Sequence, residues 1–359
     1  DGDSINVAAG TYVENVDFDG KNLKLVGVDR EATIIDGNSS GVAVRMTNYI
    51  DQALLKNFTI QNGSSEEGGG LYVLNSDPTL KNLMIKNNAS TWNGGGIFCN
   101  GASPIIEDVT ILSNSAVNVS GGIHFINGSN AKLSNVDIIN NAAAADGGGI
   151  NCYGSSPNIY KVTLVGNTSG NGGGIFCGDG SSPNVLNTVI ADNYPQEIYF
   201  DESSTGDSIS ISFSVVKNGQ SGITTNDNGT VMWGLGNIDI DPMFTDTASA
   251  DYSLQRISHL IDRGHPDSTD LDGTRADIGA YYFDQIDLPG RINPRTFIES
   301  DSVTINWSTS SDATVSSYKI YRSYGSGVLD SESNKLLDYS AATELATVSG
   351  TSYTDGAVE

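Results

Sequence analysis

The sequence predicts an all-β fold in which the chain winds into a parallel β-helix, with three short strands in each turn. The first observation is a repeated segment, because GGGIFC at 94–99 returns unchanged at 172–177 and in looser form at 68–73, 120–125 and 147–152. The second is its regular step. The last glycines of the five copies lie 26, 26, 27 and 25 residues apart, at Gly70, Gly96, Gly122, Gly149 and Gly174. Self-similarity at a step of about 20 to 50 residues is typical of solenoids and propellers.

Two further landmarks keep the same step. One is a second strand-like segment, and its copies are LKNFTI from Leu55, LKNLMI from Leu80, IEDVTI from Ile106, LSNVDI from Leu133, IYKVTL from Ile159 and VLNTVI from Val185. The other is a turn that ends in proline in four copies, at Pro78, Pro104, Pro157 and Pro183. These landmarks leave almost no helix-forming stretch in a unit, which indicates three strands per turn.

A leucine-rich repeat is the alternative interpretation, since Leu80-x-x-Leu83-x-Ile85-x-x-Asn88 fits its pattern and its period. Such a repeat needs an amphipathic helix, or a substitute for one, after the asparagine. Here the chain continues as NASTWNGGGIFCNGASP, with three glycines and a short alternating strand. The β-helix is therefore the better interpretation.

The stacking of turns predicts which side chains face inward, because strands of neighbouring turns lie about 4.8 Å apart and their side chains alternate in direction. Two inward rows follow, one with Leu71, Ile97, Ile123, Ile150 and Ile175, the other with Val73, Cys99, Phe125, Cys152 and Cys177. The three cysteines are therefore expected to be small core residues. At the bends we expect ladders of amide side chains, one of which contains Asn88, Asn114, Asn141, Asn167 and Asn193.

The chain is strongly acidic, with 43 Asp and Glu against 18 Lys and Arg among 359 residues and a net charge of −25. Nucleic acid and anionic membrane surfaces are therefore poor partners, because little of this surface can neutralise phosphate groups. No apolar run approaches the roughly 18 residues of a membrane span, so we expect no membrane insertion in this segment. The same negative field favours Ca²⁺ as a bound ion.

The segments that flank the repeats are INVAAGTYVENVDFDGKNLKLVG from Ile5 and, within 236–281, GNIDIDPMF, DYSLQ and HLIDRGHPDSTDLDGTRADIGAY. Together with the repeats, they resemble the pectin-lyase-like superfamily of right-handed parallel β-helix proteins over residues 1–284. The resemblance implies a right-handed helix of three sheets in a secreted bacterial protein that is extracellular or attached to the cell surface. It fixes no single function, because the superfamily includes lyases, hydrolases and adhesins.

Residues 285–295, QIDLPGRINPR, contain two prolines and a glycine and are predicted to be a linker. Residues 296–359 resemble a fibronectin type III domain through SVTINWS with Trp307, SYKIYRS with Tyr318 and Tyr321, and ELATVSGTSYTDGAV. The last two strands of such a sandwich are missing, which predicts a small β-sandwich fragment. Because an unfinished sandwich exposes a sheet edge, we expect the native protein to continue with further modules or an anchoring tail.

The resemblance implies that a substrate would lie along the outside of the sheet formed by the GGGIFC strands. The outward residues there are Tyr72, Phe98, His124, Asn151 and Phe176, beside Leu74, Asn100, Ile126, Tyr153 and Gly178. These rows contain no Arg or Lys for proton abstraction and no carboxyl pair for glycoside hydrolysis. The enzyme motifs Arg-x-Pro-x-x-Arg, Asn-Thr-Asp and Gly-His-Gly are also absent from the sequence. No catalytic residue is therefore assigned.

Aromatic side chains on this face favour a binding function, because their rings match the apolar faces of sugars. The predicted carbohydrate-binding residues are Tyr72, Phe98, His124, Tyr153 and Phe176. We expect the partner to be a polysaccharide or another cell-surface component, bound without catalysis.

Two alternatives stay open for this face. Loops or a neighbouring chain could cover the aromatic side chains, as in a passive stalk. A polysaccharide lyase or glycoside hydrolase could instead use His124 with Tyr153, or the loop carboxylates Glu66, Glu67 and Asp146.

A metal site is predicted in DSTDLDGTRAD, where four carboxylates crowd around a glycine turn: Asp267, Asp270, Asp272 and Asp277. Ca²⁺ takes about six to eight oxygen ligands, so these residues are candidates for a structural calcium site at the closing end. The glutamate at the twelfth position of an EF-hand is missing. The alternative is that Arg263 and Arg275 neutralise the cluster.

Overall fold

The structure is a computed structural model that describes residues 2–285 and the segments 295–299, 302–306, 318–322, 328–329, 335–336, 343–350 and 352–355. The chain divides into two compact units. The first contains Asp1–Ser268 and Arg275–Tyr282, and the second contains Thr269–Thr274 and Phe283–Glu359.

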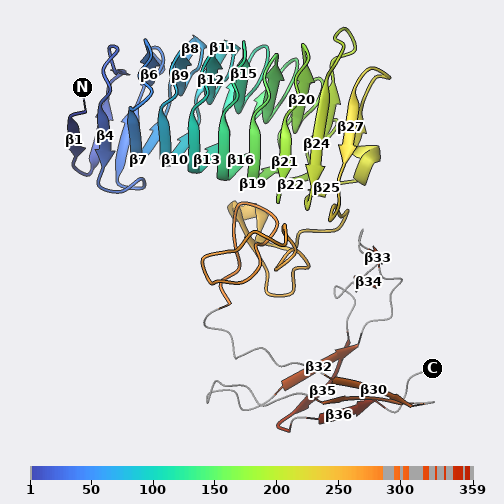
Figure 1. Ribbon diagram of the computed structural model, residues 1–359. Helices are drawn as coiled ribbons and strands as arrows, with labels where there is room; N and C mark the ends of the chain where they lie inside the picture. Colours follow the sequence, from blue (N-terminus) through green and yellow to red (C-terminus); the bar gives the residue numbers. More distant parts are fainter. Residues whose placement is uncertain are drawn as a thin grey trace. The chain divides into compact units, whose positions relative to one another are not determined.

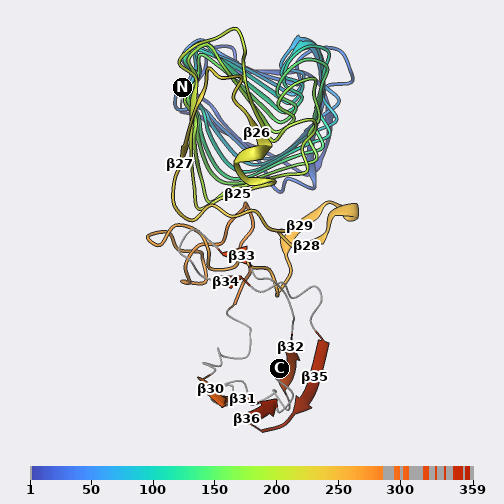
Figure 2. The same ribbon diagram turned by 90° about the vertical axis from the view of Figure 1, so that its right-hand side faces the viewer.

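The first unit is a parallel β-helix whose successive turns superpose when it is viewed end on (Figure 1, Figure 2). The longest sheet, sheet A, follows the order β1 (Ser4–Val7), β4 (Lys24–Gly27), β7 (Leu54–Gln61), β10 (Thr79–Lys86), β13 (Ile105–Leu112), β16 (Lys132–Ile139), β19 (Asn158–Val165), β21 (Asn184–Leu186), β24 (Ser208–Ser212) and β27 (Thr230–Trp233). It also includes β2 (Gly10–Val13), β5 (Thr33–Asp36), β22 (Val189–Ala191) and β25 (Val215–Val216).

Sheet B is formed by the strands of the GGGIFC copies and their equivalents in other turns. In order these are β3 (Val16–Asp17), β6 (Val44–Thr47), β9 (Leu71–Leu74), β12 (Ile97–Asn100), β15 (Ile123–Ile126), β18 (Ile150–Tyr153), β20 (Ile175–Gly178), β23 (Ile198–Phe200) and β26 (Ile223–Thr224). Sheet C is shorter and contains β8 (Ser64–Glu67), β11 (Ala89–Asn93), β14 (Ser115–Ala116) and β17 (Ala142–Ala143).

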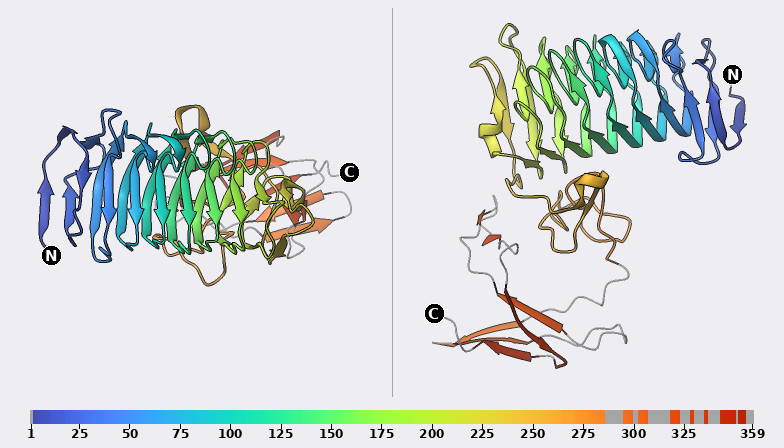
Figure 3. Two further views of the ribbon diagram at one scale, coloured as in Figure 1. Left: turned by 90° about the horizontal axis from the view of Figure 1, so that it is seen from above. Right: turned by 180° about the vertical axis from the view of Figure 1, so that it is seen from behind.

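The predicted fold class is confirmed. Strands of successive turns lie side by side along the helix (Figure 3), and all pairs within the three sheets are parallel. The pairing of β8 with β11 shifts register between Ser90 and Asn93. Among the residues that the structure describes there is no α-helix, and the helical segments are the single 3₁₀ turns η1 (Gly219–Gly222) and η2 (Thr247–Ser249).

The two predicted inward rows form the core. Ile97 pairs with Leu71 and Ile123 on the neighbouring turns, and Cys99 pairs with Val73 and Phe125. Every member of both rows is fully buried, which stabilises the fold by about 1.5–3 kcal/mol for each large apolar side chain. The three cysteines are buried thiols, including Cys152 and Cys177, which face each other in register.

The glycine triplets are needed because backbones of neighbouring turns approach closely at this bend. A Cβ atom on Gly95 would lie 2.2 Å from the carbonyl oxygen of Ser115, which no side chain can tolerate. The first glycine of the triplet, Gly94, has a φ of 65°, in the left-handed region that favours glycine. The repeat is therefore a steric requirement of stacking.

The predicted asparagine ladder runs through the helix interior and fixes one corner. From Asn88 to Asn167, each Nδ2 group donates to the Oδ1 atom of the next asparagine and to a backbone carbonyl of an earlier turn. For Asn141 these acceptors are Asn167 at 3.0 Å and Ile111 at 2.9 Å. The backbone N–H also donates forward, from Asn114 to Asn141 Oδ1 at 2.9 Å. Buried amides are thus satisfied and tie each turn to its neighbours.

A second corner has an equivalent ladder of hydroxyl groups. The N–H of Ala102 donates to Ser129 Oγ, that of Ser129 to Ser155 Oγ, and that of Ser155 to Ser181 Oγ, at 3.0–3.2 Å. The N–H of Ser181 donates to the carboxylate of Asp207 at 3.0 Å. Both ladders donate in the same direction along the helix.

Residues 236–278 follow the last turn of the helix and include the antiparallel hairpin β28 (Phe244–Asp246) and β29 (Asp251–Leu254). This closing segment has its own small core, in which Leu260, Ala276 and Ile278 are fully buried.

The described part of the second unit contains small antiparallel sheets, as the predicted sandwich fragment requires. One is β30 (Arg295–Glu299), β31 (Ser302–Asn306) and β36 (Ser352–Asp355), the next β32 (Tyr318–Arg322) with β35 (Thr343–Val348), and the last β33 (Val328–Leu329) with β34 (Lys335–Leu336). The fibronectin type III assignment stays a prediction. Trp307 and all of the predicted linker except Gln285 and Arg295 lie outside the described residues.

Replacing a ladder asparagine should destabilise the helix strongly. In Asn141→Ala the amide of Asn114 loses an acceptor and the carbonyl of Ile111 loses a donor, both of them buried. We expect a loss of about 3 kcal/mol or more in the free energy of unfolding, measured by urea denaturation. The control is Asn158→Ala, because Asn158 is exposed at the start of β19. Equal stability of the two variants would contradict the ladder's role.

Candidate functional site

The outer face of sheet B carries one continuous row of side chains, as predicted. The register places Phe98 between Tyr72 and His124, and Asn151 between His124 and Phe176. The row extends further than the sequence analysis indicated, because Arg45 on β6 aligns with Tyr72 and Tyr199 on β23 aligns with Phe176.

Arg45 was missed because its turn lacks the glycine triplet that marks the repeat. The repeat period alone could have identified Arg45, because VRMT at 44–47 lies 27 residues before LYVL at 71–74. The guanidinium carbon of Arg45 lies 4.6 Å from the centre of the Tyr72 ring, a cation–π contact. A cation therefore stands next to the first aromatic ring of the row, between Tyr72 and Asp17 on β3, although the five turns used for the prediction contain none.

The aromatic rings of the row stack on one another. The ring centres of Tyr72 and Phe98 are 5.4 Å apart, those of Phe98 and His124 are 5.5 Å apart, and those of Phe176 and Tyr199 are 5.9 Å apart, all with nearly parallel planes. The faces of Phe98 are consequently occupied by its neighbours, and only 1% of this residue is exposed. Phe176 is also buried, so these two rings do not offer a free surface to a sugar.

His124 and Asn151 interrupt the aromatic row with buried polar groups. His124 is only 3% exposed, and burial lowers the pKa of its imidazole to about 4, although the Asn151 amide opposes this shift. Nδ1 of His124, Oδ1 of Asn151 and Oγ of Ser120 are buried without a hydrogen-bond partner in the protein. The imidazole is therefore covered and only weakly basic, which is unfavourable for a general base.

Tyr153 is the one predicted binding residue with a widely exposed ring, at 39%. It lies in the second outward row, next to Gly178 on the following turn. A Cβ atom on Gly178 would lie 3.2 Å from each of Tyr153 Cδ2, Phe176 Cε1 and Asp201 Cβ. Gly178 is itself buried, and the side chains of Tyr153, Phe176 and Asp201 close around it, so a side chain at this position would displace them.

Two carboxylates flank this part of the face. Asp146 is half-buried and accepts a hydrogen bond from Asn171 Nδ2 at 2.9 Å. Burial raises the pKa of Asp146; the hydrogen bond from Asn171 opposes the shift, and the charge of Asp201 adds to it. Asp146 and Asp201 therefore act on each other electrostatically, on the same face as Tyr153.

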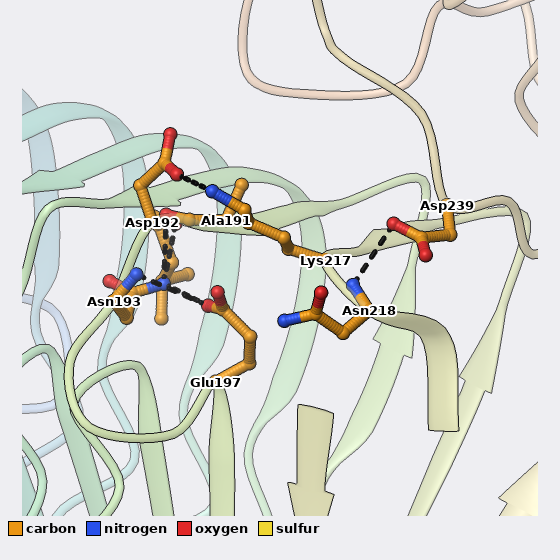
Figure 4. A network of polar contacts seen from close by, with 8 residues as sticks. Ala191, Asp192, Asn193, Glu197, Lys217, Asn218 and Asp239 are labelled. Atoms are coloured by element: carbon orange, nitrogen blue, oxygen red, sulfur yellow. Dashed lines mark hydrogen bonds and ion pairs between the residues drawn. The ribbon is translucent and has the colours of Figure 1, made fainter. Parts of the chain in front are cut away.

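Another buried carboxyl group, that of Glu197, ends the asparagine ladder (Figure 4). Its Oε2 atom accepts from Asn193 Nδ2 at 2.7 Å, while Lys217 pairs with Asp192 nearby and the N–H of Asn218 donates to Asp239 at 2.9 Å. Burial raises the pKa of Glu197 to about 7, against the effect of the Asn193 hydrogen bonds. Because the ladder uses this carboxyl group as its last acceptor, its role is structural.

The predicted calcium ligands are all described. Asp277 is buried and accepts from the N–H of Asp262 at 2.6 Å, and Asp272 accepts from the N–H and hydroxyl groups of Thr274 at 3.0 and 2.8 Å. Asp267 is exposed and Asp270 is buried. Within the described residues no group of three or more His, Cys, Asp or Glu comes together in a way that could hold a metal ion. Calcium binding here stays a prediction.

In the described part of the chain, no helix is both long and apolar enough to span a membrane.

Comparison with known proteins identifies one family. The sequence profile of the family described as "Right handed beta helix region" matches residues 40–237, more than half of the chain and nearly all turns of sheet B. No curated protein and no solved structure matched the chain in the corresponding searches.

Replacing Glu197 by Gln should change how stability depends on pH. The folded pKa of about 7 lies above the ordinary value of 4.5, so the folded protein binds the extra proton and loses stability as pH rises from about 4.5 to 7. Relative to wild type, Glu197→Gln should gain about 1–3 kcal/mol over this range and no more above it, in urea unfolding at a series of pH values. A difference independent of pH would show that the carboxyl group titrates normally.

Proposed function

The chain belongs to the right-handed β-helix family, and on that premise we propose that it binds polysaccharide on the outer face of sheet B without chemically altering it. The observation that carries the proposal is the exposed side chain of Tyr153, which lies beside Phe176 and Asp201 over the buried Gly178. A sugar ring has an apolar face that fits such an aromatic side chain, and its hydroxyl groups can donate to the flanking Asp201. Another glycan-bearing component of a cell surface presents the same chemistry.

The predicted binding residues contribute unequally to this proposal. Tyr153 would contact the sugar directly, and Tyr72, which is half-buried, would contact it at the edge of its ring. Phe98, His124 and Phe176 would support the face from below, because they are buried in the row. A neutral glycan is the favoured ligand class, since the net charge of −25 repels polymers of uronic acids. An extracellular or cell-surface location, where such polymers are accessible, is part of the proposal.

Binding without catalysis is supported by the surroundings of two side chains that could otherwise act as a catalytic acid or base. His124 is covered and only weakly basic, and Glu197 serves the asparagine ladder.

One observation favours glycoside hydrolysis as a second candidate function. Asp146 and Asp201 bring two interacting carboxylates to the face, and burial raises the pKa of Asp146. Reducing ends released by wild type and not by Asp146→Asn would establish hydrolysis in place of simple binding.

Removing the Tyr153 ring should weaken glycan binding. We expect Tyr153→Ala to lose about tenfold or more in affinity for the best ligand from a glycan array and from pull-down on insoluble polysaccharides, with little change in stability. Gly178→Val should weaken binding similarly, because the added side chain would displace the Tyr153 ring and Asp201.

The matched control is Tyr49→Asn. Tyr49 is 73% exposed, lies four turns away, and has a left-handed backbone that asparagine tolerates. The proposal fails if wild type binds no glycan, or if Tyr153→Ala binds as well as Tyr49→Asn.

A further inference from the structure

The chain that leaves the closing segment lies across the outer face of sheet A. Three consecutive residues contact three successive turns of the helix. The N–H of Gly279 donates to the carbonyl of Asn187 at 2.9 Å, and the N–H of Ala280 donates to Thr163 Oγ1 at 3.0 Å. The phenol of Tyr281 is hydrogen-bonded to the carboxyl group of Asp137. We call residues 279–282 the strap.

The strap covers part of one outward row of sheet A. In this row Asp137 on β16 pairs with Thr110 on one side and with Thr163 on the other, and Thr163 pairs with Val189. Asp137, Thr163 and Val189 are buried although they point away from the core, whereas Thr110 is only half-buried. Coverage therefore ends at Asp137, where the strap makes its last contact.

The segment before the strap is anchored independently of Asp137. The N–H of His265 donates to Asn187 Oδ1 at 2.7 Å, and the His265 ring packs edge-on against Phe213 at 4.9 Å. The N–H of Ile278 donates to the carbonyl of Leu260 at 3.1 Å inside the closing segment's own core. The strap can consequently detach while the closing segment stays in place.

Asp137 is poorly accommodated under the strap when it is ionised. It is 4% exposed, and its Oδ1 atom has no hydrogen-bond partner in the protein. Burial raises the pKa of its carboxyl group to about 7, against the effects of the Tyr281 phenol and of Arg30, which lies between β4 and β5. The other titratable groups nearby are Tyr252 and Asp251 on β29; the Asp137 charge helps to raise the pKa of Tyr252, and Asp251 does the same for Tyr281.

We propose that proton binding by Asp137 controls how firmly the strap is held on sheet A. In acid the protonated carboxyl group fits the covered site, and the strap stays attached. Towards neutral pH the group must ionise in a buried place, so attachment weakens. The β-helix thus carries a strap whose attachment to sheet A depends on pH.

The direction of this pH dependence, and the pH range over which it acts, follow from the difference in the pKa of Asp137 between the attached and the detached strap. With the strap attached the pKa is about 7, and with the strap detached an exposed Asp137 returns to its ordinary value of 3.8. Between these values only the attached state holds the proton, so the opening constant rises by up to about tenfold for each pH unit. Above pH 7 both states are ionised and the opening constant levels off.

Hydrogen exchange of the full chain, corrected for the intrinsic pH dependence of exchange, tests the proposal on a peptide that covers 279–282. In wild type the opening constant should rise at least tenfold from pH 5 to pH 7 and then level off. In Asp137→Asn and Asp137→Thr it should not vary with pH. Threonine is a matched replacement, because Thr110 and Thr163 flank this position in the same row.

Glu197→Gln is the control for a buried carboxyl group elsewhere, and its strap should behave as in wild type. Peptides from β16 report whether each variant is folded. The proposal is overturned if the wild-type strap shows no dependence on pH, or if the dependence persists in both Asp137 variants.

Discussion

The stacking of one turn directly on the next, about 4.8 Å away and in register, is the constraint on which the whole structure depends. Side chains alternate along a strand, so the register that puts Ile97 in the core necessarily puts Phe98 outside. A slip of one residue would exchange the two faces of sheet B. The glycine triplets permit the close approach of turns, and the ladders at the corners allow a single pairing between them.

The ladders also explain where buried carboxylates occur. Each rung donates its N–H, and in the asparagine ladder also its amide, to an oxygen of the following turn. After the last rung there is no further turn of the ladder to accept a hydrogen bond. The ladder must therefore end on a group that only accepts hydrogen bonds. Glu197 fills this position in the asparagine ladder and Asp207 in the serine ladder. A carboxylate meets that need, and burial raises the pKa of this group at Glu197.

The period and the alternation of side chains were sufficient to predict the fold, the inward rows and the asparagine ladder, because each follows from local pattern. Which of the outward side chains are exposed to solvent was not predictable in the same way. Phe98 and Phe176 point outward as expected, yet neighbouring rings and the bend before the strand cover them, while Tyr153 stays exposed beside a glycine. Arg45 joins the row from a turn without the glycine signal, and Tyr281 reaches Asp137 from 144 residues further along the chain, a contact that no repeat pattern contains.

A crystal structure of the β-helix tests the central claim most directly, through the register of sheet B. The account predicts Ile97 in the core opposite Leu71 and Ile123, with the Phe98 ring stacked between Tyr72 and His124 and the Tyr153 ring open to solvent. Electron density with Phe98 in the core and Ile97 on the surface, or with helices in place of the third strand of each turn, would contradict it.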